Sequence, residues 1–301
     1  MYRNILIPLD GSKTAEAVLP LARSWSTKLK LPVELIAVVD TAELARSLSA
    51  IERFYMNNLV DEETRRCSEY LARTTESFSP DGCKSRLEKG SAANIIIDAA
   101  AVDKGTLIMM ATHGSSGINR WLLGSVAEKV LRGTSNPLLL VRAPHETPAD
   151  RHAVLSSIVV PLDGSDLAET VLPSVVDLAK KLDLEVILLR AYTVPCAIYE
   201  AGGNYTVDQE ELRAAIGIDV SQYLEEKADV LRKAGLERVL CASKEGFSSD
   251  EIIKYARGRP GSLIAMCSHG RSGVKRWMLG SVTETVVRHS GDPVLVIRAV
   301  S

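Results

Sequence analysis

The chain contains two copies of one sequence pattern. The segment NILIPLDGS at residues 4–12 returns as SIVVPLDGS at residues 157–165. A longer segment at residues 111–142 returns at residues 267–298, with 16 of 32 positions identical. The copies lie 153 to 156 residues apart, which is the length of a domain, whereas solenoid and propeller repeats are about 20–50 residues long. The sequence therefore predicts a duplicated domain.

The segment between the copies has the composition of a linker. Residues 143–153, APHETPADRHA, contain two prolines and no apolar periodicity, as exposed connections between domains do. We expect the first domain at residues 1–143, the linker at residues 144–153 and the second domain at residues 154–301. The offset between the copies grows from 153 residues at the first motif to 156 at the last, so the second copy has gained three residues.

Short apolar runs alternate with helical periodicity in each copy. The expected strands lie at 5–9, 33–39, 85–89, 107–111 and 138–141, and near 158–162, 185–189, 239–243, 262–266 and 294–298. The expected helices of the first copy lie at 15–29, 62–78, 92–102 and 126–132. Apolar strands that alternate with helices are typical of a parallel sheet covered on both faces. We therefore expect an α/β protein with two tandem doubly wound, five-stranded parallel sheets of Rossmann-like type. Residues 41–60 and 191–208 fit this pattern least well.

The overall composition excludes several classes of protein. With 36 Lys and Arg against 38 Asp and Glu, the net charge is −2, which argues against a sequence-independent nucleic-acid binder. No apolar run approaches the roughly 20 residues that span a bilayer, and Pro8 and Asp10 interrupt any signal peptide. The five cysteines are scattered and form no CxxC pair, so neither a disulfide framework nor a zinc site is expected. We expect a protein of a reducing cytoplasm, with no membrane or nucleic-acid partner.

Two glycines flank a nine-residue loop after the fourth strand of each copy. They are Gly114 and Gly124 in the first copy, and Gly270 and Gly280 in the second. Glycine lets backbone N–H groups approach an anion because it has no Cβ, and the helix that follows adds unpaired N–H groups and the positive end of its dipole. The loop is longer than the usual two to six residues, which favours a function. The pattern predicts a phosphate site, and a plain helix start is the alternative.

A second signal lies at the same helix starts. Ser125 and Glu128 in the first copy, like Ser281 and Glu284 in the second, have the spacing of a capping box. We expect each serine to be the residue that caps its helix.

The first strand of each copy ends in the sequence PLDGS. It places Pro8 and Asp10 at the end of the first copy's strand, and Pro161 and Asp163 at the equivalent position of the second. Ligands of open parallel sheets bind beyond the carboxyl ends of the strands at the switch point. If the first and fourth strands are neighbours, each aspartate faces the same crevice as the glycine loop. It would then accept a hydrogen bond from a nucleoside; an Asp that caps its own turn is the alternative.

Taken together, these motifs resemble those of the universal stress protein family. PLDGS after the first strand, followed by HGxxGxxRxxLGSVxExV after the fourth, is similar to its tandem-domain members over nearly the whole chain. The family pattern Gly-x2-Gly-x9-Gly, followed by Ser or Thr, marks members that bind ATP. Ala111 and Cys267 stand where the first glycine is expected. The bulkier cysteine would crowd a ligand more, so we expect the tighter ATP site in the first copy, although the second loop is more basic.

The resemblance implies one ATP site in each copy, and a fold of the adenine-nucleotide alpha-hydrolase type. In the first copy the implied nucleotide-binding residues are Pro8, Asp10, Val38, Met110, Ala111, Gly114, Gly124, Ser125 and Val126. In the second copy they are Pro161, Asp163, Ala191, Met266, Cys267, Gly270, Gly280, Ser281 and Val282. By similarity, Asp10 and Val38 would contact the adenosine, and the glycines with Ser125 and Val126 would hold the phosphates. Mg²⁺ could accompany ATP without protein side chains as ligands.

The function implied by the resemblance is ATP-binding regulation in the stress response, with the nucleotide as a signal or a structural ligand. No residue offers itself as a base for an attacking water, so no catalytic residue is assigned. A slow ATPase or phosphotransfer enzyme and a nucleotide-free interaction module stay open. His113 and His269 occupy equivalent places, and for both we favour a role in ordering the loop.

The fifth strand of each copy, at residues 138–141 and 294–297, is short and apolar. An apolar strand at the edge of a sheet promotes aggregation unless it is covered or paired. Single-domain members of the family dimerise through this strand, so the resemblance implies a pseudo-twofold pair of domains joined through their fifth strands. We expect charges at Leu139 and Val296, if these side chains face outward, to separate the domains. A homodimer of the whole chain stays open.

Overall fold

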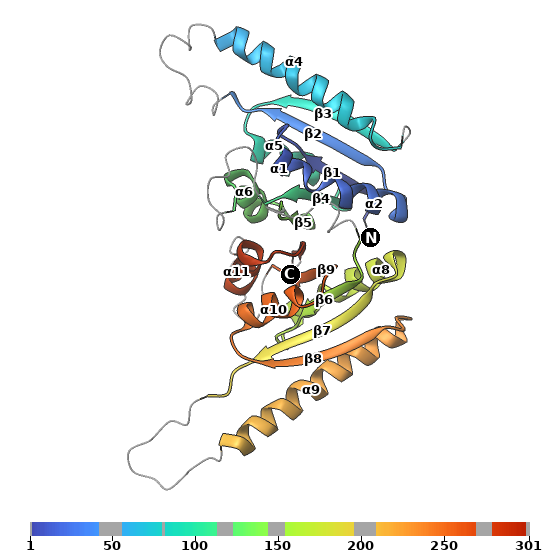
Figure 1. Cartoon of the computed structure of the whole chain (residues 1–301), viewed down its shortest axis with the longest axis vertical. Helices are drawn as coiled ribbons and strands as arrows, with labels where there is room; N and C mark the ends of the chain where they lie inside the picture. Colours follow the sequence, from blue (N-terminus) through green and yellow to red (C-terminus); the bar gives the residue numbers. More distant parts are fainter. Residues whose placement is uncertain are drawn as a thin grey trace, which may run out of the picture.

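The computed structural model describes residues 2–41, 56–79, 82–112, 123–143, 154–195, 209–268 and 279–298. Two α/β halves lie one above the other along the longest axis of the molecule (Figure 1). The expected linker, residues 144–153, lies outside the described residues, as do residues 42–55 and 196–208 of the two stretches that fitted the strand–helix pattern least. None of the helices in the described ranges is long and apolar enough to cross a membrane.

The two halves repeat the same order of elements. The first half contains β1 (Asn4–Pro8), α1 (Lys13–Glu16), α2 (Leu19–Leu29), β2 (Val33–Val39), α4 (Met56–Thr75), β3 (Cys83–Lys89), α5 (Ala92–Ala101), β4 (Thr106–Ala111), α6 (Ser125–Gly133) and β5 (Leu138–Val141). The second half contains β6 (Ser157–Pro161), α7 (Asp166–Glu169), α8 (Leu172–Leu182), β7 (Glu185–Tyr192), α9 (Gln209–Lys233), β8 (Val239–Glu245), α10 (Ser248–Arg257), β9 (Ser262–Cys267), α11 (Ser281–His289) and β10 (Val294–Ile297).

The ten strands form one sheet with the order β3-β2-β1-β4-β5-β10-β9-β6-β7-β8. All pairs within each half are parallel, and the β5–β10 pair that joins the halves is antiparallel. The expected α/β class and the two five-stranded parallel halves are therefore confirmed. β1 lies next to β4, and β6 next to β9, so each half has its switch point where the sequence placed it.

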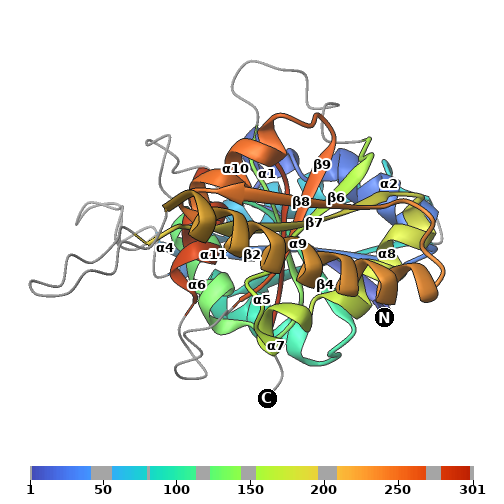
Figure 2. The same ribbon diagram turned by 90° about the horizontal axis from the view of Figure 1, so that it is seen from below.

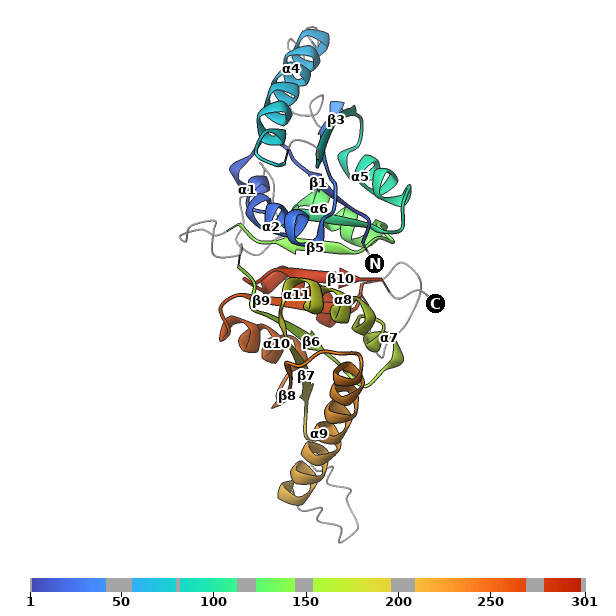
Figure 3. The same ribbon diagram turned by 90° about the vertical axis from the view of Figure 1, so that its right-hand side faces the viewer.

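Helices cover both faces of the sheet (Figure 3). Alternate residues of each central strand enter different cores: Ile5 and Ile7 pack on one face, and Leu6 packs on the other. Buried residues of α2, α4, α8 and α9 complete the first core, and those of α5, α6, α10 and α11 complete the second. Burial on both faces explains why these strands are continuously apolar in the sequence.

Two helices differ from the sequence-based prediction. The single helix expected at 15–29 is divided into α1 and α2, because Pro20 in the first turn of α2 has no N–H to continue a preceding helix. The helix expected at 62–78 is α4, which includes the six residues before the expected start, from Met56 on. Among the described residues, α9 has 25 residues and α4 has 20. In the sequence, α9 lies between β7 and β8, and the offset between the copies changes from 153 to 156 residues between these two strands. Seen from that end of the molecule, α9 lies in front of the sheet (Figure 2).

The junction between the halves is built from β5 and β10. Leu139 lies opposite Leu295, and Leu140 opposite Val294, in antiparallel register. The predicted pairing of the two domains through their fifth strands is thus confirmed. The sequence left open whether Leu139 and Val296 face outward; they are 0% and 2% exposed, so both side chains are buried. The sheet continues across the junction, and helices of both halves bury its two faces.

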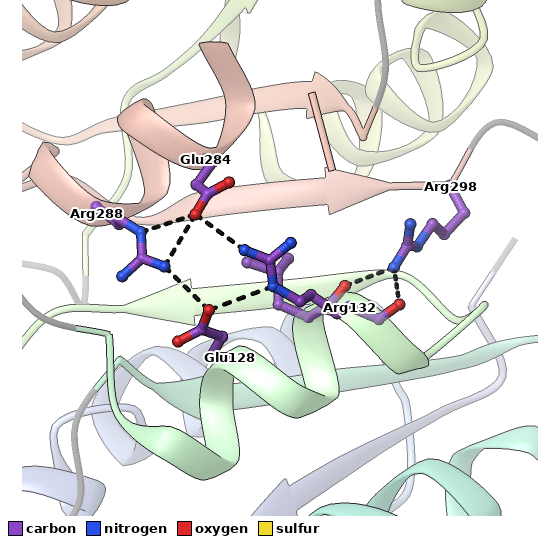
Figure 4. Close-up of polar contacts among 6 residues, drawn as sticks. Glu128, Arg132, Glu284, Arg288 and Arg298 are labelled. Carbon is purple, nitrogen blue, oxygen red and sulfur yellow. Dashed lines mark hydrogen bonds and ion pairs between the residues drawn. The ribbon is translucent and has the colours of Figure 1, made fainter. Parts of the chain in front are cut away.

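A ring of four charged side chains joins α6 to α11 on one face of the junction (Figure 4). Across the halves, Arg132 Nη2 lies 3.0 Å from Glu284 Oε1, and Arg288 Nη2 lies 3.1 Å from Glu128 Oε1. Within each helix, Arg132 pairs with Glu128 at 3.3 Å and Arg288 with Glu284 at 2.9 Å. Each guanidinium therefore bridges one carboxylate of its own half and one of the other.

Two further arginines bind helix ends across the junction. Arg298, just after β10, donates to the carbonyl oxygens of Leu131 at 2.6 Å and Arg132 at 2.7 Å in the last turn of α6. Arg142, just after β5, donates to the Arg288 carbonyl oxygen of α11 at 2.6 Å. The C-terminal carbonyl groups of a helix lack helical donors, so each arginine satisfies acceptors of the other half.

Candidate functional site

A cavity lies at the carboxyl ends of the strands in each half, at the switch point. The first has a volume of about 190 Å³ and the second about 520 Å³. Eight of the nine residues predicted for the first copy line the first cavity: Pro8, Asp10, Val38, Met110, Ala111, Gly124, Ser125 and Val126. The equivalent eight line the second: Pro161, Asp163, Ala191, Met266, Cys267, Gly280, Ser281 and Val282. Gly114 and Gly270 lie outside the described residues, as do His113 and His269.

The long loop of each half is anchored at both ends. The N–H of Gly124 donates to the Thr112 carbonyl oxygen at 2.8 Å, and the N–H of Gly280 donates to the Ser268 carbonyl oxygen at 2.8 Å. Thr112 is held in turn by the Val141 carbonyl oxygen of β5, at 2.9 Å. The residue before each loop and the glycine after it are therefore tied together at the end of β4 or β9, which places the following helix at the cavity.

The helix starts differ from the predicted capping box. The first helical hydrogen bond of α6 runs from the Glu128 N–H to the Gly124 carbonyl oxygen, at 2.8 Å, so Gly124 is the N-cap and Ser125 the first helical residue. Gly280 and Ser281 have the same places in α11. The Glu128 and Glu284 side chains belong to the ring of four charges at the junction. Their ion pairs with arginines of the other half compete with hydrogen bonds to the N-terminus of their own helix.

This helix start presents donors to the cavity. The N–H groups of Ser125, Val126 and Ala127 precede the first helical hydrogen bond, so the helix itself supplies them with no acceptor. All three residues line the first cavity, and Ser281, Val282 and Thr283 line the second. Exposed N–H groups and the positive end of the helix dipole stabilise an anion at this position.

Asp10 occupies the opposite side of the switch point, at the end of β1. Its Oδ1 accepts hydrogen bonds from the Ser12 N–H at 3.0 Å and the Ser12 hydroxyl at 2.6 Å, and Asp163 binds Ser165 in the same way. The turn-capping role that was the alternative reading is thus observed, and both carboxylates also line their cavities. Gly11 has a φ of 79°, a left-handed conformation that explains the glycine of PLDGS.

Several lining residues were not predicted. Asp40, directly after β2, lines the first cavity, and its carboxylate accepts a hydrogen bond from the Ala92 N–H at 3.4 Å. Its place at the end of a strand, like that of Asp10, was a signal that could have identified it. In the second half, Thr193 stands at the position of Asp40 and Ser248 at that of Ala92, so a hydroxyl group replaces the carboxylate.

Among the described residues, the second cavity has a wall with no counterpart in the lining of the first. It reaches Arg190 and Tyr192 of β7 and the residues Ile216, Asp219 and Val220 of α9. No residue of α4 lines the first cavity among the described residues. Helix positions this far from the motifs carry no local signal in the sequence, which explains why these residues were missed.

Cys267 lines the second cavity at the position that Ala111 has in the first. It is 4% exposed at the end of β9, and the Thr170 hydroxyl donates to its Sγ at 3.4 Å. The cavity beside it is the larger of the two, because α9 and Arg190 extend its walls. Among the described residues, no group of three or more His, Cys, Asp or Glu side chains could hold a metal ion.

Comparisons with known proteins agree with this architecture. The model of the universal stress protein family (Usp) matches residues 1–142 and again residues 155–298. A universal stress protein of Mycolicibacterium smegmatis is 24% identical over 301 residues, covering 98% of this chain and 96% of that protein. One of Methanocaldococcus jannaschii is 31% identical over 146 residues, which are 48% of this chain and 84% of that protein.

A solved structure shares the fold over the full length. The crystal structure of a universal stress protein from Archaeoglobus fulgidus matches with a TM-score of 0.69 and 22% identity, covering 99% of this chain and 98% of that chain. The family model matches each half in turn, and the tandem relatives match both halves together. The chain therefore belongs to the universal stress protein family, with two Usp domains in tandem.

Proposed function

We propose that this protein is a regulatory protein of the stress response in which each half binds ATP as a signal or a structural ligand. The observation that carries the proposal is the start of α6 and of α11, where N–H groups ahead of the first helical hydrogen bond lie on the cavity wall. Such helix starts bind phosphate groups. The repetition of the arrangement supports one nucleotide in each half.

The opposite wall of the cavity supports an orientation for the nucleotide. The phosphates would lie against Gly124, Ser125 and Val126, and the adenosine against Val38 and Asp10. A carboxylate beside the phosphates would repel them, whereas at the nucleoside end it can accept a hydrogen bond from a hydroxyl or amino group. Gly114 and Gly270 belong to the proposed sites by their place in the family motif.

The two cavities fit a nucleotide to different degrees. Ligand sites for small molecules usually enclose about 300–1,000 Å³. The second cavity, with about 520 Å³, lies in this range, and the described walls of the first, with about 190 Å³, enclose part of a nucleotide. Mg²⁺ would bind mainly to phosphate oxygens and water, since it commonly takes few protein ligands when phosphates are present.

Efficient hydrolysis of ATP is not part of the proposal. A general base must reach the attacking water, and the described lining of the two cavities contains no histidine. The carboxylates of Asp10 and Asp163 already accept hydrogen bonds from Ser12 and Ser165. We therefore expect retention of the nucleotide in place of turnover.

The test is the binding of ATP by calorimetry to the whole chain and to two single variants. Gly124→Val and Gly280→Val each place a branched side chain at a phosphate-binding position. The backbone angles of Gly124, φ −60° and ψ 147°, are open to any residue, so the fold should persist. Gly291→Val is the matched control, because a Cβ at Gly291 meets nothing within 4 Å and the residue lines neither cavity.

We expect two equivalents of ATP for the parent and for Gly291→Val, and one equivalent for each of the other variants. ATP should also be recovered from the protein when it is denatured after purification. Full binding in both Gly124→Val and Gly280→Val would refute the site. Steady-state phosphate release that both substitutions reduce would support the slow ATPase, and an absence of any nucleotide binding would support the interaction module.

A further inference from the structure

The second cavity contains a lobe between the end of β7 and α9. We define this lobe by Arg190 and Tyr192 on the strand and by Ile216, Asp219 and Val220 on the helix. It adjoins Ala191, the equivalent of Val38, which the proposed function places against the adenosine. The lobe therefore extends the second site beyond the nucleoside end of the bound nucleotide.

The equivalent positions of the first half carry different side chains. The positions of Arg190 and Tyr192 correspond to Ala37 and Val39, which are 1% and 3% exposed in the core. The facing helix α4 carries Glu63 and Arg66, whose side chains bind each other at 2.6 Å. In the first half the arginine, Arg66, is thus on the helix and is ion-paired with Glu63. In the second half the arginine, Arg190, is on the strand and lines the cavity.

Arg190 is held in position by a chain of contacts. Its guanidinium lies 4.7 Å from the centre of the Tyr223 ring. The Tyr223 hydroxyl donates to Glu169 Oε1 at 2.9 Å, and Lys227 Nζ lies 2.7 Å from Glu169 Oε2. Burial, and next the adjacent Glu169 carboxylate, raises the pKa of Tyr223, so its hydroxyl stays protonated as a donor. The negative charge of Glu169 is balanced by Lys227.

Arg190 is also an unpaired cation within the described part of the chain. No carboxylate there lies within 4.0 Å of its guanidinium, although Asp163 and Asp219 line the same cavity. A half-buried guanidinium that is positioned by stacking and has no carboxylate partner among the described residues suits a bidentate anion such as phosphate. The charged residues among the described lining of the first cavity are Asp10 and Asp40, both acidic.

We propose that the second half binds a nucleotide with an additional phosphate group on its nucleoside half, and that Arg190 binds this group. The inference rests on the proposed function, because it takes the 5′-phosphates to lie at Gly280, Ser281 and Val282. The additional group lies in the lobe, on the other side of the nucleoside. The first half, with two carboxylates and no cation in the described lining, does not select for such a ligand.

The test compares AMP with adenosine 3′,5′-bisphosphate, two probes that differ in one phosphate group. Calorimetry is done on the full chain carrying Gly124→Val, so that the second site alone is titrated. We expect the bisphosphate to bind about tenfold more tightly than AMP, as a charge-assisted guanidinium–phosphate contact provides. Adenosine 2′,5′-bisphosphate is the second arm, and the tighter of the two isomers shows which ribose position faces the lobe.

Substitution of Arg190 separates its role from a general effect of charge. Arg190→Gln should abolish the preference for the bisphosphate and leave the affinity for AMP within about twofold. Arg190→Lys should retain part of this preference, because lysine keeps the positive charge but not the paired donors of the guanidinium group. Arg213→Gln is the matched control: Arg213 is also on the β7–α9 side, is ion-paired with Glu245 at 2.9 Å and does not line the cavity.

The outcomes distinguish this inference from the proposed function. If AMP and ATP bind and neither bisphosphate binds more tightly than AMP, the inference is overturned and the proposed function stands. A preference that persists in Arg190→Gln, or an equal loss of AMP and bisphosphate binding in that variant, overturns the role of Arg190. If no nucleotide binds to the second site, both proposals fail.

Discussion

At the junction the two halves contribute equivalent residues, whereas at the cavities they do not. Glu128 and Arg132 of α6 meet Glu284 and Arg288 of α11 in a reciprocal ring. At the cavities, by contrast, Arg190 stands in the second half where the first has a small apolar residue. At a pseudo-twofold junction each element packs against its own counterpart, so a change in one half alters the contact of both. The described lining of each cavity comes from its own half, so the two cavities can differ independently.

The largest expected effect is at the junction, where the halves are alike. Leu139→Asp places a charge at a side chain that is 0% exposed and lies opposite Leu295 in the sheet. We expect the free energy of unfolding to fall by more than about 4 kcal/mol, since a buried leucine is lost and a carboxylate takes its place. Urea denaturation followed by circular dichroism measures this loss.

Because the junction is symmetric, Leu295 of the second half provides a comparison for the substitution of Leu139. Leu295→Asp should cost a similar amount, whereas Leu139→Met should cost less than about 1.5 kcal/mol because it keeps the volume. Two stable, separately unfolding halves in Leu139→Asp would show that the junction does not hold them together.

The next effect concerns the difference between the two cavities. ATP should bind several-fold more tightly to the first half, as the sequence predicts, because Ala111 is smaller than Cys267 and leaves more room for the ligand at the end of the strand. Titration of Gly280→Val measures the first site, and titration of Gly124→Val measures the second. Tighter binding at the second site would show that its additional cations outweigh the closer fit.

A smaller effect is expected from the ring of four charges. A double-mutant cycle with Glu128→Gln and Arg288→Gln should give a coupling energy of about 0.5–1 kcal/mol that decreases with added salt. The side chains are 34% and 21% exposed, so solvent screens the pair in part. The control is the more exposed pair Arg232 and Asp229 within α9, for which we expect a smaller coupling. Equal coupling in both cycles would contradict a structural role for the ring.

The smallest effect is a pH dependence in the first half. Burial, and next the neighbouring Glu63, raises the pKa of Cys67 to about 11. The folded state therefore favours the protonated thiol, so its stabilising contribution is complete below about pH 8.5, the pKa of a free thiol, and is lost as the pH rises towards 11. Cys67→Val introduces the valine found at the equivalent Val220 and should remove this contribution.

The measurement is the melting temperature between pH 8 and pH 10.5. The parent should lose about 1–2 °C more than Cys67→Val over this interval. An identical decrease in the two proteins would show that the thiol does not contribute.

Much of the fold could be predicted because it depends on local patterns. The strand positions follow from apolar runs that are buried on both faces. The pairing of β5 with β10 was implied by the resemblance to the family, whose single-domain members dimerise through this short apolar strand. The division of the expected helix into α1 and α2 also follows from a local signal, Pro20, although the prediction placed a single helix there. The capping role of Ser125 was wrong for another reason: its partner Glu128 binds Arg288, a residue 160 positions away, which no local pattern shows.

The sequence by itself determined that the chain folds as two equivalent α/β halves, and it placed Asp10, Ser125 and their counterparts at the switch points. These features depend on burial periodicity and on backbone hydrogen bonds between near neighbours in the chain. Only the tertiary structure decided the ring of charges at the junction, the additional wall from α9 and the position of Arg190 over Tyr223. Those depend on how helices pack against strands, which brings together residues that are far apart in the sequence.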